Sequence, residues 1–422
     1  MLRSLALART TLCITRVART TVHQPLVPLY SSSSSSSRQP AMADSITLAA
    51  PFDAHVHLRQ GNLMRLVTPH VHQGGIRMAF VMPNLVPPLT LPEHTIAYAK
   101  ELQALAPSLH ILPSLYLTAN LTPQHIRDAK QGGIVGVKSY PRGVTTNSDG
   151  GVGMEGYAVY DAVFAEMERV DMVLNLHGEV PSDVDGDGTC VLNAEERFLP
   201  HLREINRKFP KLRIVLEHCT TAAAVEAVKS LPPNVVATIT PHHLHLTIDG
   251  ACSTPLGFCK PLAKFPSDRA ALRAAVASGS PKFFLGSDSA PHPSRSKLPA
   301  LGVARVVVAA GPDGTSDGEE ARDEVTLPSP CAAGIYTGAN LVPLTAEIFE
   351  RSGIPLDRLE GFVSTHGRAF YGFPAREGDD VVLRRVEGKT VDKAYGYKTD
   401  QGEDEWVIPF LAGEEIRWEI AA

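Results

Sequence analysis

Histidines with strand-like spacing stand near the start of the sequence, at His55 and His57, and Arg59 continues the spacing. Side chains at every second position of a β-strand point to the same face, so these three would lie together. Two imidazoles that converge in this way can bind one metal ion. A His-x-His pair alone is weak evidence, because ordinary polar residues also end strands. The pair predicts a metal site only if further ligands converge on it.

Residue types that bind metals also end later apolar runs of the sequence. They are His177, Glu179, Glu217, His218 and Asp288. Another run ends near Lys138, where an ammonium group would repel metal ions. The lysine makes chemical sense if carbon dioxide has converted its amine to a carbamate, a carboxylate able to bridge two ions. Four histidines, one aspartate and such a carbamate predict a pair of divalent metals about 3.5–4 Å apart.

Eight short apolar runs of β type carry these residues, and stretches of helical period separate them. The runs span 46–58, 76–84, 111–118, 134–141, 171–179, 212–219, 235–244 and 282–292, and helix candidates include 92–105, 156–170, 194–209, 220–231 and 268–278. Near-continuous apolar strands between helices indicate a parallel sheet that is covered on both faces. Eight such units predict an α/β fold, a (β/α)₈ TIM-type barrel with the binuclear metal site at the C-terminal ends of its strands.

An open, doubly wound sheet is the structural alternative to the barrel. That fold often marks its nucleotide site with a Gly-x-Gly-x-x-Gly turn after a strand, and none of the runs precedes such a turn. The barrel is therefore the favoured fold.

The composition is that of an ordinary globular protein. Of the 422 residues, 44% are hydrophobic and 20% charged, which is enough for a large core. A net charge of −5 gives no sign of a surface for nucleic acid or anionic lipid. No apolar run approaches the roughly 18 residues that a membrane-spanning helix needs. The six cysteines form no C-x-x-C pair, which argues against a disulfide scaffold and a thiolate zinc site.

Residues 1–43 differ in composition from the rest of the chain. They contain five arginines, no lysine and no acidic residue, and seven serines run from Ser31 to Ser37. This composition is typical of an organelle transit peptide. A disordered leader, or an extension upstream of a start at Met42, fits it equally well. We therefore expect a leader or transit peptide over 1–43 and a barrel domain with a C-terminal extension over 44–422.

Taken together, the motifs resemble those of dihydroorotases, members of the amidohydrolase superfamily, in the short single-function type of bacteria and fungi. The resemblance covers about residues 50–380. Its strings are His55-Val56-His57-Leu58-Arg59, Met82-Pro83-Asn84, Gly136-Val137-Lys138-Ser139-Tyr140-Pro141, Thr145-Thr146-Asn147-Ser148, His177-Gly178-Glu179-Val180, Glu217-His218 and Gly286-Ser287-Asp288-Ser289-Ala290-Pro291-His292.

The resemblance implies a function and a set of site residues. Members of the family interconvert N-carbamoyl-L-aspartate and L-dihydroorotate in de novo pyrimidine (UMP) synthesis. The implied cofactors are two zinc ions per subunit, bridged by N6-carboxylated Lys138. The implied metal ligands are His55, His57, Lys138, His177, His218 and Asp288. The implied substrate-binding residues are Arg59, Asn84, His177, Lys260, His292 and Ala333, and the implied lid residues are Thr145 and Thr146.

In this family Asp288 would also be the catalytic residue, moving a proton from the attacking hydroxide to the leaving nitrogen. The family further implies a homodimer in the cytoplasm, whereas a translated transit peptide over residues 1–41 would direct the chain to mitochondria.

Two alternatives stay open from the sequence. Another cyclic amidohydrolase, such as a dihydropyrimidinase or hydantoinase, would share the metal site. Arg59 and Asn84 argue against it, because a substrate without a carboxylate would leave them unpaired. A non-catalytic barrel that serves as a scaffold would be free to lose Lys138, His177, His218 or Asp288, and the sequence keeps all four.

Three further patterns receive structural interpretations. Residues 183–188 imitate the start of a calcium-binding EF-hand loop, but Ala194 occupies the position that requires a bidentate Glu, so we expect an acidic surface loop. The acidic insert 311–324 is expected to be a mobile surface loop. Histidines after the seventh run are expected to surround the site or lie at the surface rather than bind metal; they are His242, His243 and His245.

Overall fold

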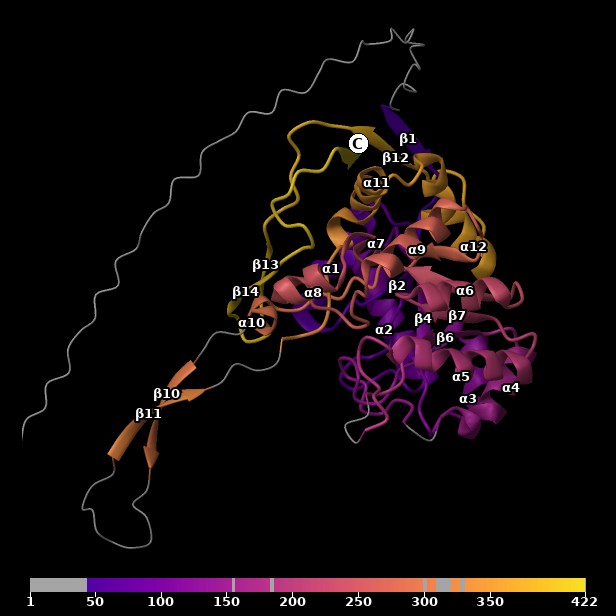
Figure 1. Cartoon of the computed structure of the whole chain (residues 1–422), viewed down its shortest axis with the longest axis horizontal. Coiled ribbons are helices and arrows are strands. Elements are labelled where there is room, and N and C mark those ends of the chain that lie inside the picture. The colour runs from indigo at the N-terminus through magenta and orange to yellow at the C-terminus, as the bar shows by residue number, and fades with distance from the viewer. Residues whose placement is uncertain are drawn as a thin grey trace, which may run out of the picture. The chain divides into compact units, whose positions relative to one another are not determined.

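Parallel strands at the centre of the protein pair in the order of the sequence and form an eight-stranded barrel (Figure 1). This computed structural model describes residues 44–153, 156–182, 186–298 and 331–421, together with the backbone of 302–308 and 320–326. The barrel strands are β2 (Phe52–Val56), β3 (Met78–Val81), β4 (His110–Tyr116), β5 (Gly136–Ser139), β6 (Val173–His177), β7 (Ile214–Glu217), β8 (Val235–Ile239) and β9 (Phe283–Leu285). The ring closes beyond β9, where Asp288 N donates to His55 O at 2.9 Å. The predicted (β/α)₈ fold is confirmed.

Helices that follow the strands pack around the barrel (Figure 1). They are α1 (Gly61–Gln73), α2 (Pro92–Leu105), α3 (Pro123–Gln131), α4 (Asp161–Arg169), α5 (Ala194–Lys208), α6 (Ala222–Ser230), α9 (Pro266–Ala277), α11 (Leu341–Ser352) and α12 (His366–Tyr371). Local signals start several of them, because α2, α3 and α9 begin with proline and Thr221 caps α6 by accepting from Ala224 N at 3.1 Å. Among helices within the described ranges, none is long and apolar enough to cross a membrane.

Inward-facing side chains change from apolar to polar along the barrel. Along β6, Val173, Asn175 and His177 occupy alternate positions and are all buried. Val173 belongs to an apolar cluster at the amino-terminal end, to which β2, β3, β4, β7, β8 and β9 also contribute. Tyr371 of α12 closes that end and its hydroxyl lies 2.6 Å from Asn175 Nδ2. The apolar layer leaves the opposite, carboxyl end for the polar residues, as in barrel enzymes.

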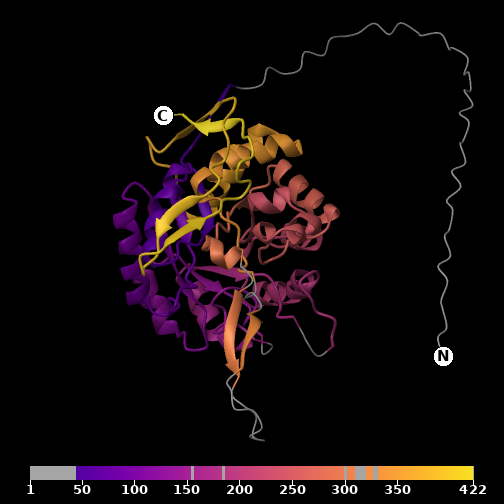
Figure 2. The ribbon, with the colours of Figure 1, turned by 90° about the vertical axis from the view of Figure 1, so that its left-hand side faces the viewer.

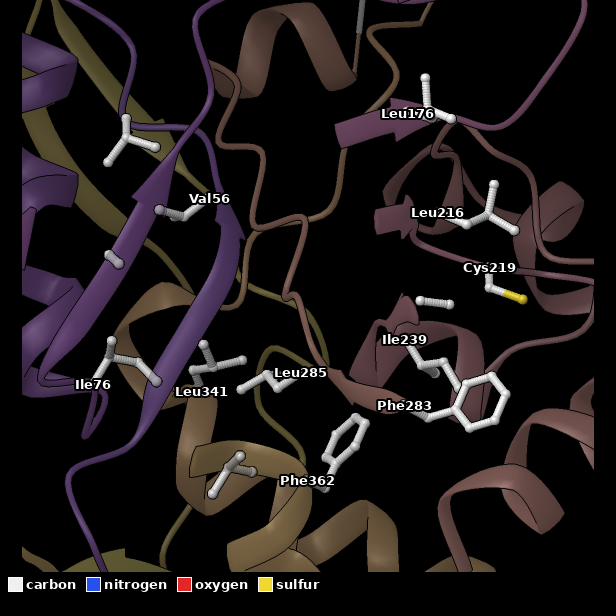
Figure 3. Packing of buried hydrophobic residues seen from close by; sticks show 14 of the residues in the cluster. Val56, Ile76, Leu176, Leu216, Cys219, Ile239, Phe283, Leu285, Leu341 and Phe362 are labelled. Carbon is white, nitrogen blue, oxygen red and sulfur yellow. The ribbon is translucent and has the colours of Figure 1, made fainter. Parts of the chain in front are cut away.

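A larger apolar cluster fills the space between the barrel and the helices. Figure 3 shows Phe283 and Leu285 of β9 close to Leu341 of α11 and to Phe362. Each of these four side chains is at most 2% exposed. This packing fixes β9, whose carboxyl end carries Asp288.

The first predicted strand, 46–58, is two strands in different sheets. β1 (Ser45–Leu48) pairs with β12 (Val381–Arg385), which pairs with β15 (Trp418–Ile420), whereas β2 joins the barrel. Ala50 between them has a φ of 40°, and Pro51 has no N–H to donate to a sheet. The prediction of one strand over 46–58 is therefore wrong. The apolar pattern continues through Ala50 and Pro51 and so does not reveal the break between the two strands. The helix predicted over 156–170 likewise begins later, at Asp161.

The C-terminal extension packs against the barrel. β13 (Tyr395–Lys398) and β14 (Asp404–Val407) form a hairpin in which β13 contacts α1 and β14 contacts α10 (Ser294–Lys297), as Figure 2 shows. Two short helices, α7 (Pro241–His245) and α8 (Ile248–Ser253), follow β8. Through β14, the C-terminal extension therefore contacts α10, the helix that follows the last barrel strand.

Part of the acidic insert is a strand rather than a loop. β10 (Gly302–Val308) pairs antiparallel with β11 (Glu320–Thr326), so the predicted loop is wrong for residues 320–324. A valine-rich partner provides the β-propensity that the acidic half lacks. Residues 311–319, 183–185 and 1–43 lie outside the described residues, and residues 186–188 are exposed.

Candidate metal centre

The six predicted metal ligands gather at the carboxyl ends of five barrel strands. His55, Lys138 and His177 lie within β2, β5 and β6, and His57, His218 and Asp288 follow β2, β7 and β9. All six side chains are buried, with none more than 8% exposed. Barrel topology thus brings together residues that are separated by up to 233 positions in the sequence.

One group of ligand atoms comes from His55, His57 and Asp288, and these atoms lie within 4.8 Å of one another. Asp288 Oδ1 is 3.4 Å from His55 Nε2 and 3.1 Å from His57 Nε2. Burial lowers the pKa of His57 to about 4, so its ring is neutral and able to bind a metal. Burial raises the pKa of Asp288, but the hydrogen bonds with His55 and His57 outweigh burial and hold this pKa well below its usual value. The group therefore offers the neutral imidazole of His57 and a carboxylate, next to the ring of His55, whose pKa the carboxylates of Glu217 and Asp288 raise despite its burial.

The other predicted ligands adjoin this group. The rings of His177 and His218 are 4.5 Å apart between centroids, and those of His55 and His218 are 5.0 Å apart. Lys138 Nζ is fully buried and has no hydrogen-bond partner within the described residues. Burial lowers the pKa of this amine to about 8. A buried amine without a partner fits carboxylation. A carbamate formed on this nitrogen would carry two oxygens, which could bind metal cations.

Carboxylates behind two of the histidines select the ring nitrogen that faces the centre. Glu217 Oε2 accepts from His55 Nδ1 at 2.9 Å, which leaves Nε2 for a metal. Glu179 Oε2 lies 2.9 Å from His177 Nε2, which leaves Nδ1 instead. The sequence indicates both glutamates only as ligand types at strand ends. Glu179 lies two residues after the histidine it orients, whereas Glu217 ends β7 and orients a histidine of β2, so the sequence pattern alone does not distinguish a ligand from a residue that orients one.

Asp53 connects the first and last strands of the barrel beneath the site. Its carboxylate accepts from Ser287 N at 2.8 Å, from Ser287 Oγ at 2.5 Å and from His55 N at 3.1 Å. The pairing of β2 with β3 shifts register between Asp53 and Val56. Phe52 and Ala54 join the interior apolar cluster, and after this irregularity His55 also faces the centre. Simple alternation along the strand would not have predicted that arrangement.

The backbone at three of the site residues is in the left-handed region. Arg59 has a φ of 60°, His218 of 39° and Asp288 of 44°. Such conformations cost about 1–3 kcal/mol each for residues with a β-carbon and cluster at functional sites. They turn the chain sharply at the ends of three strands, which directs these side chains over the mouth of the barrel.

A cleft of about 380 Å³ opens onto five of the six predicted metal ligands and five of the six predicted substrate residues; Lys138 and His292 are not among the residues that line it. Its lining residues include His55, His57, Arg59, Asn84, Thr145, Thr146, His177, His218, Lys260, Asp288 and Ala333. On one wall, Arg59 Nε donates to Pro291 O at 2.9 Å, and Arg59 Nη2 is 3.2 Å from His292 Nε2. His292 Nε2 is also 2.9 Å from Ala333 O. Burial lowers the pKa of Arg59 to about 10, so the guanidinium stays charged at neutral pH.

The loop that carries Thr145 and Thr146 is hydrogen-bonded to the cleft. Asn84 Nδ2 donates to Thr146 O at 2.9 Å, and Asn147 Nδ2 donates to Asn84 O at 3.0 Å. Lys260 Nζ donates to Val144 O at 2.7 Å. Two of the predicted substrate residues therefore contact the predicted lid.

The histidines after β8 differ partly from expectation. His242 and His243 are buried, so a surface position is wrong for these two, and their ligand atoms lie within 4.8 Å of Cys259 Sγ. Both ring nitrogens of His243 have partners, because Nδ1 is 2.9 Å from Thr240 Oγ1 and Nε2 is 3.0 Å from Pro261 O. A satisfied imidazole of this kind has a structural role.

Known proteins that are similar to this chain in sequence and structure include dihydroorotases. No protein-family model matches the chain. The dihydroorotase of Mycosarcoma maydis is 48% identical over 397 residues, which cover 89% of this chain and 98% of that protein. The dihydroorotase of Saccharomyces cerevisiae is 40% identical over 398 residues, which cover 90% and 99%. A crystal structure of the S. cerevisiae dihydroorotase in complex with 5-fluoroorotic acid matches with a TM-score of 0.77 at 39% identity, covering 90% of this chain and 99% of that one.

The barrel and the histidine–aspartate group at its mouth define the class, a metal-dependent hydrolase of the amidohydrolase type. Its substrates are cyclic amides. Given the identity and coverage of its relatives, the chain belongs to the dihydroorotase family. The predicted enzyme is confirmed over the hydantoinase and scaffold alternatives.

Proposed function

We propose that the chain converts N-carbamoyl-L-aspartate to L-dihydroorotate, reversibly, with two zinc ions held by the six ligands at the barrel mouth. The observation that carries this proposal is the shared cleft, in which the metal-ligand group lies beside a buried, charged Arg59. A metal group alone suits many hydrolases, whereas an arginine in the same cleft suits a substrate that bears a carboxylate.

The residues fit a two-metal centre, in which His55, His57 and Asp288 would hold one ion and His177 and His218 would hold the other. Carboxylated Lys138 would bridge the two, which its buried, unpartnered amine supports. When bound, zinc supplies positive charge that polarises the ring carbonyl and lowers the pKa of the attacking water.

Asp288 has the protonation state that a general base needs. Its low pKa keeps it ionised, and it faces the cleft rather than the barrel interior. In the ring-opening direction Asp288 accepts a proton from the attacking water and later delivers it to the ring nitrogen that leaves. In the ring-closing direction the same oxygen takes the proton from the attacking nitrogen.

Substrate recognition is assigned to residues that line or adjoin the same cleft beside the metal ligands. Arg59, Asn84 and His292 bind the carboxylate and ring, and the backbone at Lys260 and Ala333 adds hydrogen bonds. The ligand named for the S. cerevisiae relative, 5-fluoroorotic acid, is a pyrimidine carboxylic acid, which supports a carboxylate site here. His177 also contacts the substrate from the metal side.

Thr145 and Thr146 form a lid over the bound substrate. Their loop already makes hydrogen bonds to Asn84 and Lys260, which supports closure over the cleft. We further propose a homodimer with no nucleic-acid or membrane partner. It would be cytoplasmic unless residues 1–41 serve as a mitochondrial transit peptide.

An activity assay on the full chain, loaded with zinc in bicarbonate buffer, tests the function. Loss of L-dihydroorotate and formation of N-carbamoyl-L-aspartate would be followed beside hydantoin and dihydrouracil. We expect turnover of dihydroorotate alone. Turnover of hydantoin or dihydrouracil instead would contradict the carboxylate site, and metal analysis showing fewer than two ions would contradict the binuclear centre.

A further inference from the structure

A buried lysine outside the predicted site joins two segments of the cleft wall. Lys297 ends α10 and is only 5% exposed. Its Nζ donates to Phe258 O and to Ala332 O, both at 2.9 Å. Burying a charged group is costly unless it is well hydrogen-bonded, so an ammonium placed here needs both carbonyls.

The two carbonyls adjoin the backbone positions assigned to substrate binding. Phe258 precedes Lys260 by two residues, and Ala332 directly precedes Ala333. Gly334 N also donates to Phe258 O at 3.0 Å, so this carbonyl connects the same two segments a second time. The ammonium therefore lies at the junction of the two chain segments.

The chain itself does not link these segments locally. Residues 299–330 separate Leu298 from Cys331, and about forty residues separate Phe258 from Lys297. α10 and the returning segment also meet through Ala332 N, which donates to Ser296 O at 2.9 Å, and through Cys331 Sγ, which lies 3.4 Å from Lys297 O. Because these segments are distant in sequence, side-chain hydrogen bonds are needed to join them into one wall of the cleft.

Movement of either segment would reach the substrate residues directly. Ala333 O is 2.9 Å from His292 Nε2, which lies 3.2 Å from Arg59 Nη2. On the other segment, Lys260 Nζ donates to Val144 O of the lid loop. Both connections begin within two residues of a carbonyl that Lys297 holds.

We propose that Lys297 is a positioning residue that fixes the backbone of Lys260 and Ala333 for substrate binding. This inference rests on the proposed function, in which those two positions contact the substrate. Lys297 touches neither substrate nor metal, so it acts on substrate affinity and leaves the metal centre and the chemical step in place.

Lys297→Met tests the proposal, because methionine has a similar length and shape but no donor. Lys282→Met is the matched control. Lys282 Nζ also donates to backbone carbonyls, at 2.8 Å to Val228 O and 3.1 Å to Pro232 O, but it precedes β9 at the opposite end of the barrel. Both variants lose a lysine that binds carbonyls, and only the first borders the cleft.

The measurements are KM and kcat for dihydroorotate, the Kd of 5-fluoroorotate by calorimetry, zinc content and thermal midpoint. For Lys297→Met we expect KM and Kd to rise about tenfold or more, kcat to stay within about threefold, and zinc content to stay unchanged. Lys297→Gln, which keeps two N–H donors on a shorter stem, should give an intermediate KM. Lys282→Met should lower the thermal midpoint and leave KM unchanged.

A folded, zinc-loaded Lys297→Met protein with wild-type KM and Kd would overturn the proposal, as would equal rises in KM for both lysine variants. Loss of zinc in Lys297→Met would also overturn it, because the effect would then be general. If the methionine variant does not fold, the glutamine variant is judged by the same criteria. Failure of the wild-type chain to turn over dihydroorotate would contradict the proposed function, whereas wild-type turnover with an unchanged variant contradicts only the role of Lys297.

Discussion

Removal of the Arg59 side chain tests the carboxylate site most directly. The guanidinium is held in place on the cleft wall, because Nε donates to Pro291 O at 2.9 Å and Nη2 lies 3.2 Å from His292 Nε2. Arginine has five N–H donors in a planar fork, so two such contacts leave donors for a carboxylate. Arg59→Met keeps the length of the side chain and removes every donor and the charge. Arg59→Lys keeps the charge on a single nitrogen.

The expected loss follows from the number of hydrogen bonds. A hydrogen bond to a charged group contributes about 1.5–3 kcal/mol, and a bidentate carboxylate uses two of them, or about 3–6 kcal/mol. Since about 1.4 kcal/mol corresponds to a factor of ten, Arg59→Met should lower kcat/KM by about 10²–10⁴. A lysine at this position can donate to Pro291 O or to the substrate but not to both in fork geometry, so Arg59→Lys should lose about 10–10².

Steady-state kinetics with L-dihydroorotate, alongside zinc analysis, measures the effect. Arg295→Met is the control, because Arg295 is exposed and its partners, Glu403 and Glu405, belong to the C-terminal extension. The control should keep kcat/KM within about twofold of wild type. A loss below tenfold in Arg59→Met with two zinc ions still bound would refute a carboxylate clamp. Loss of zinc in that variant would show instead that Arg59 supports the metal centre.

Three further substitutions test other parts of the site. Asp288→Asn should lower kcat at least about 10²-fold while the protein stays folded, as circular dichroism and turnover would report; retained turnover would contradict a proton-transfer role. Gly334→Ala should raise KM and lower the thermal midpoint, because the added β-carbon would lie 2.7 Å from Ala290 O and the backbone φ is 156°. The control is Gly353→Ala, which should change only the midpoint, because its φ is 70° and no atom lies within 4 Å of the added β-carbon. Burial raises the pKa of Glu195 from 4.5 to about 7, so the folded state binds this proton more tightly than the unfolded state and stability falls as pH rises through that window. Glu195→Gln should remove up to about 3 kcal/mol of this pH-dependent loss in the free energy of unfolding. Urea unfolding of both proteins at pH 5 and pH 8 measures the difference, and the same pH dependence in both would argue against the raised pKa.

The barrel and its ligand positions could be predicted because each depends on local order in the sequence. Parallel strands place their carboxyl ends at one rim of the barrel. The positions of His177, His218 and Asp288 at the ends of apolar runs were therefore enough to predict that they lie together. Apolar continuity, however, hid the break at Ala50 and Pro51, since buried strands of two different sheets have the same composition.

Contacts between distant segments set the remaining features of the site. Glu217 orients His55 across 162 positions of sequence, and the segment after α10 meets Phe258 through the ammonium of Lys297. A glutamate at a strand end and a lysine in a short helix have many ordinary roles, so neither residue type reveals its partner. The contact of Asp53 with Ser287 likewise joins β2 to the segment after β9, which the first barrel strand meets only when the ring closes.

Left-handed backbone at Arg59, His218 and Asp288 has a consequence for protein engineering. Glycine adopts such angles without a steric penalty, so Gly at any of these positions would relieve local strain. A library screened only for resistance to heat would therefore apply no selection to retain the arginine, the histidine or the aspartate. Thermostable variants of this enzyme need a screen that demands turnover in every round, with these three codons held constant.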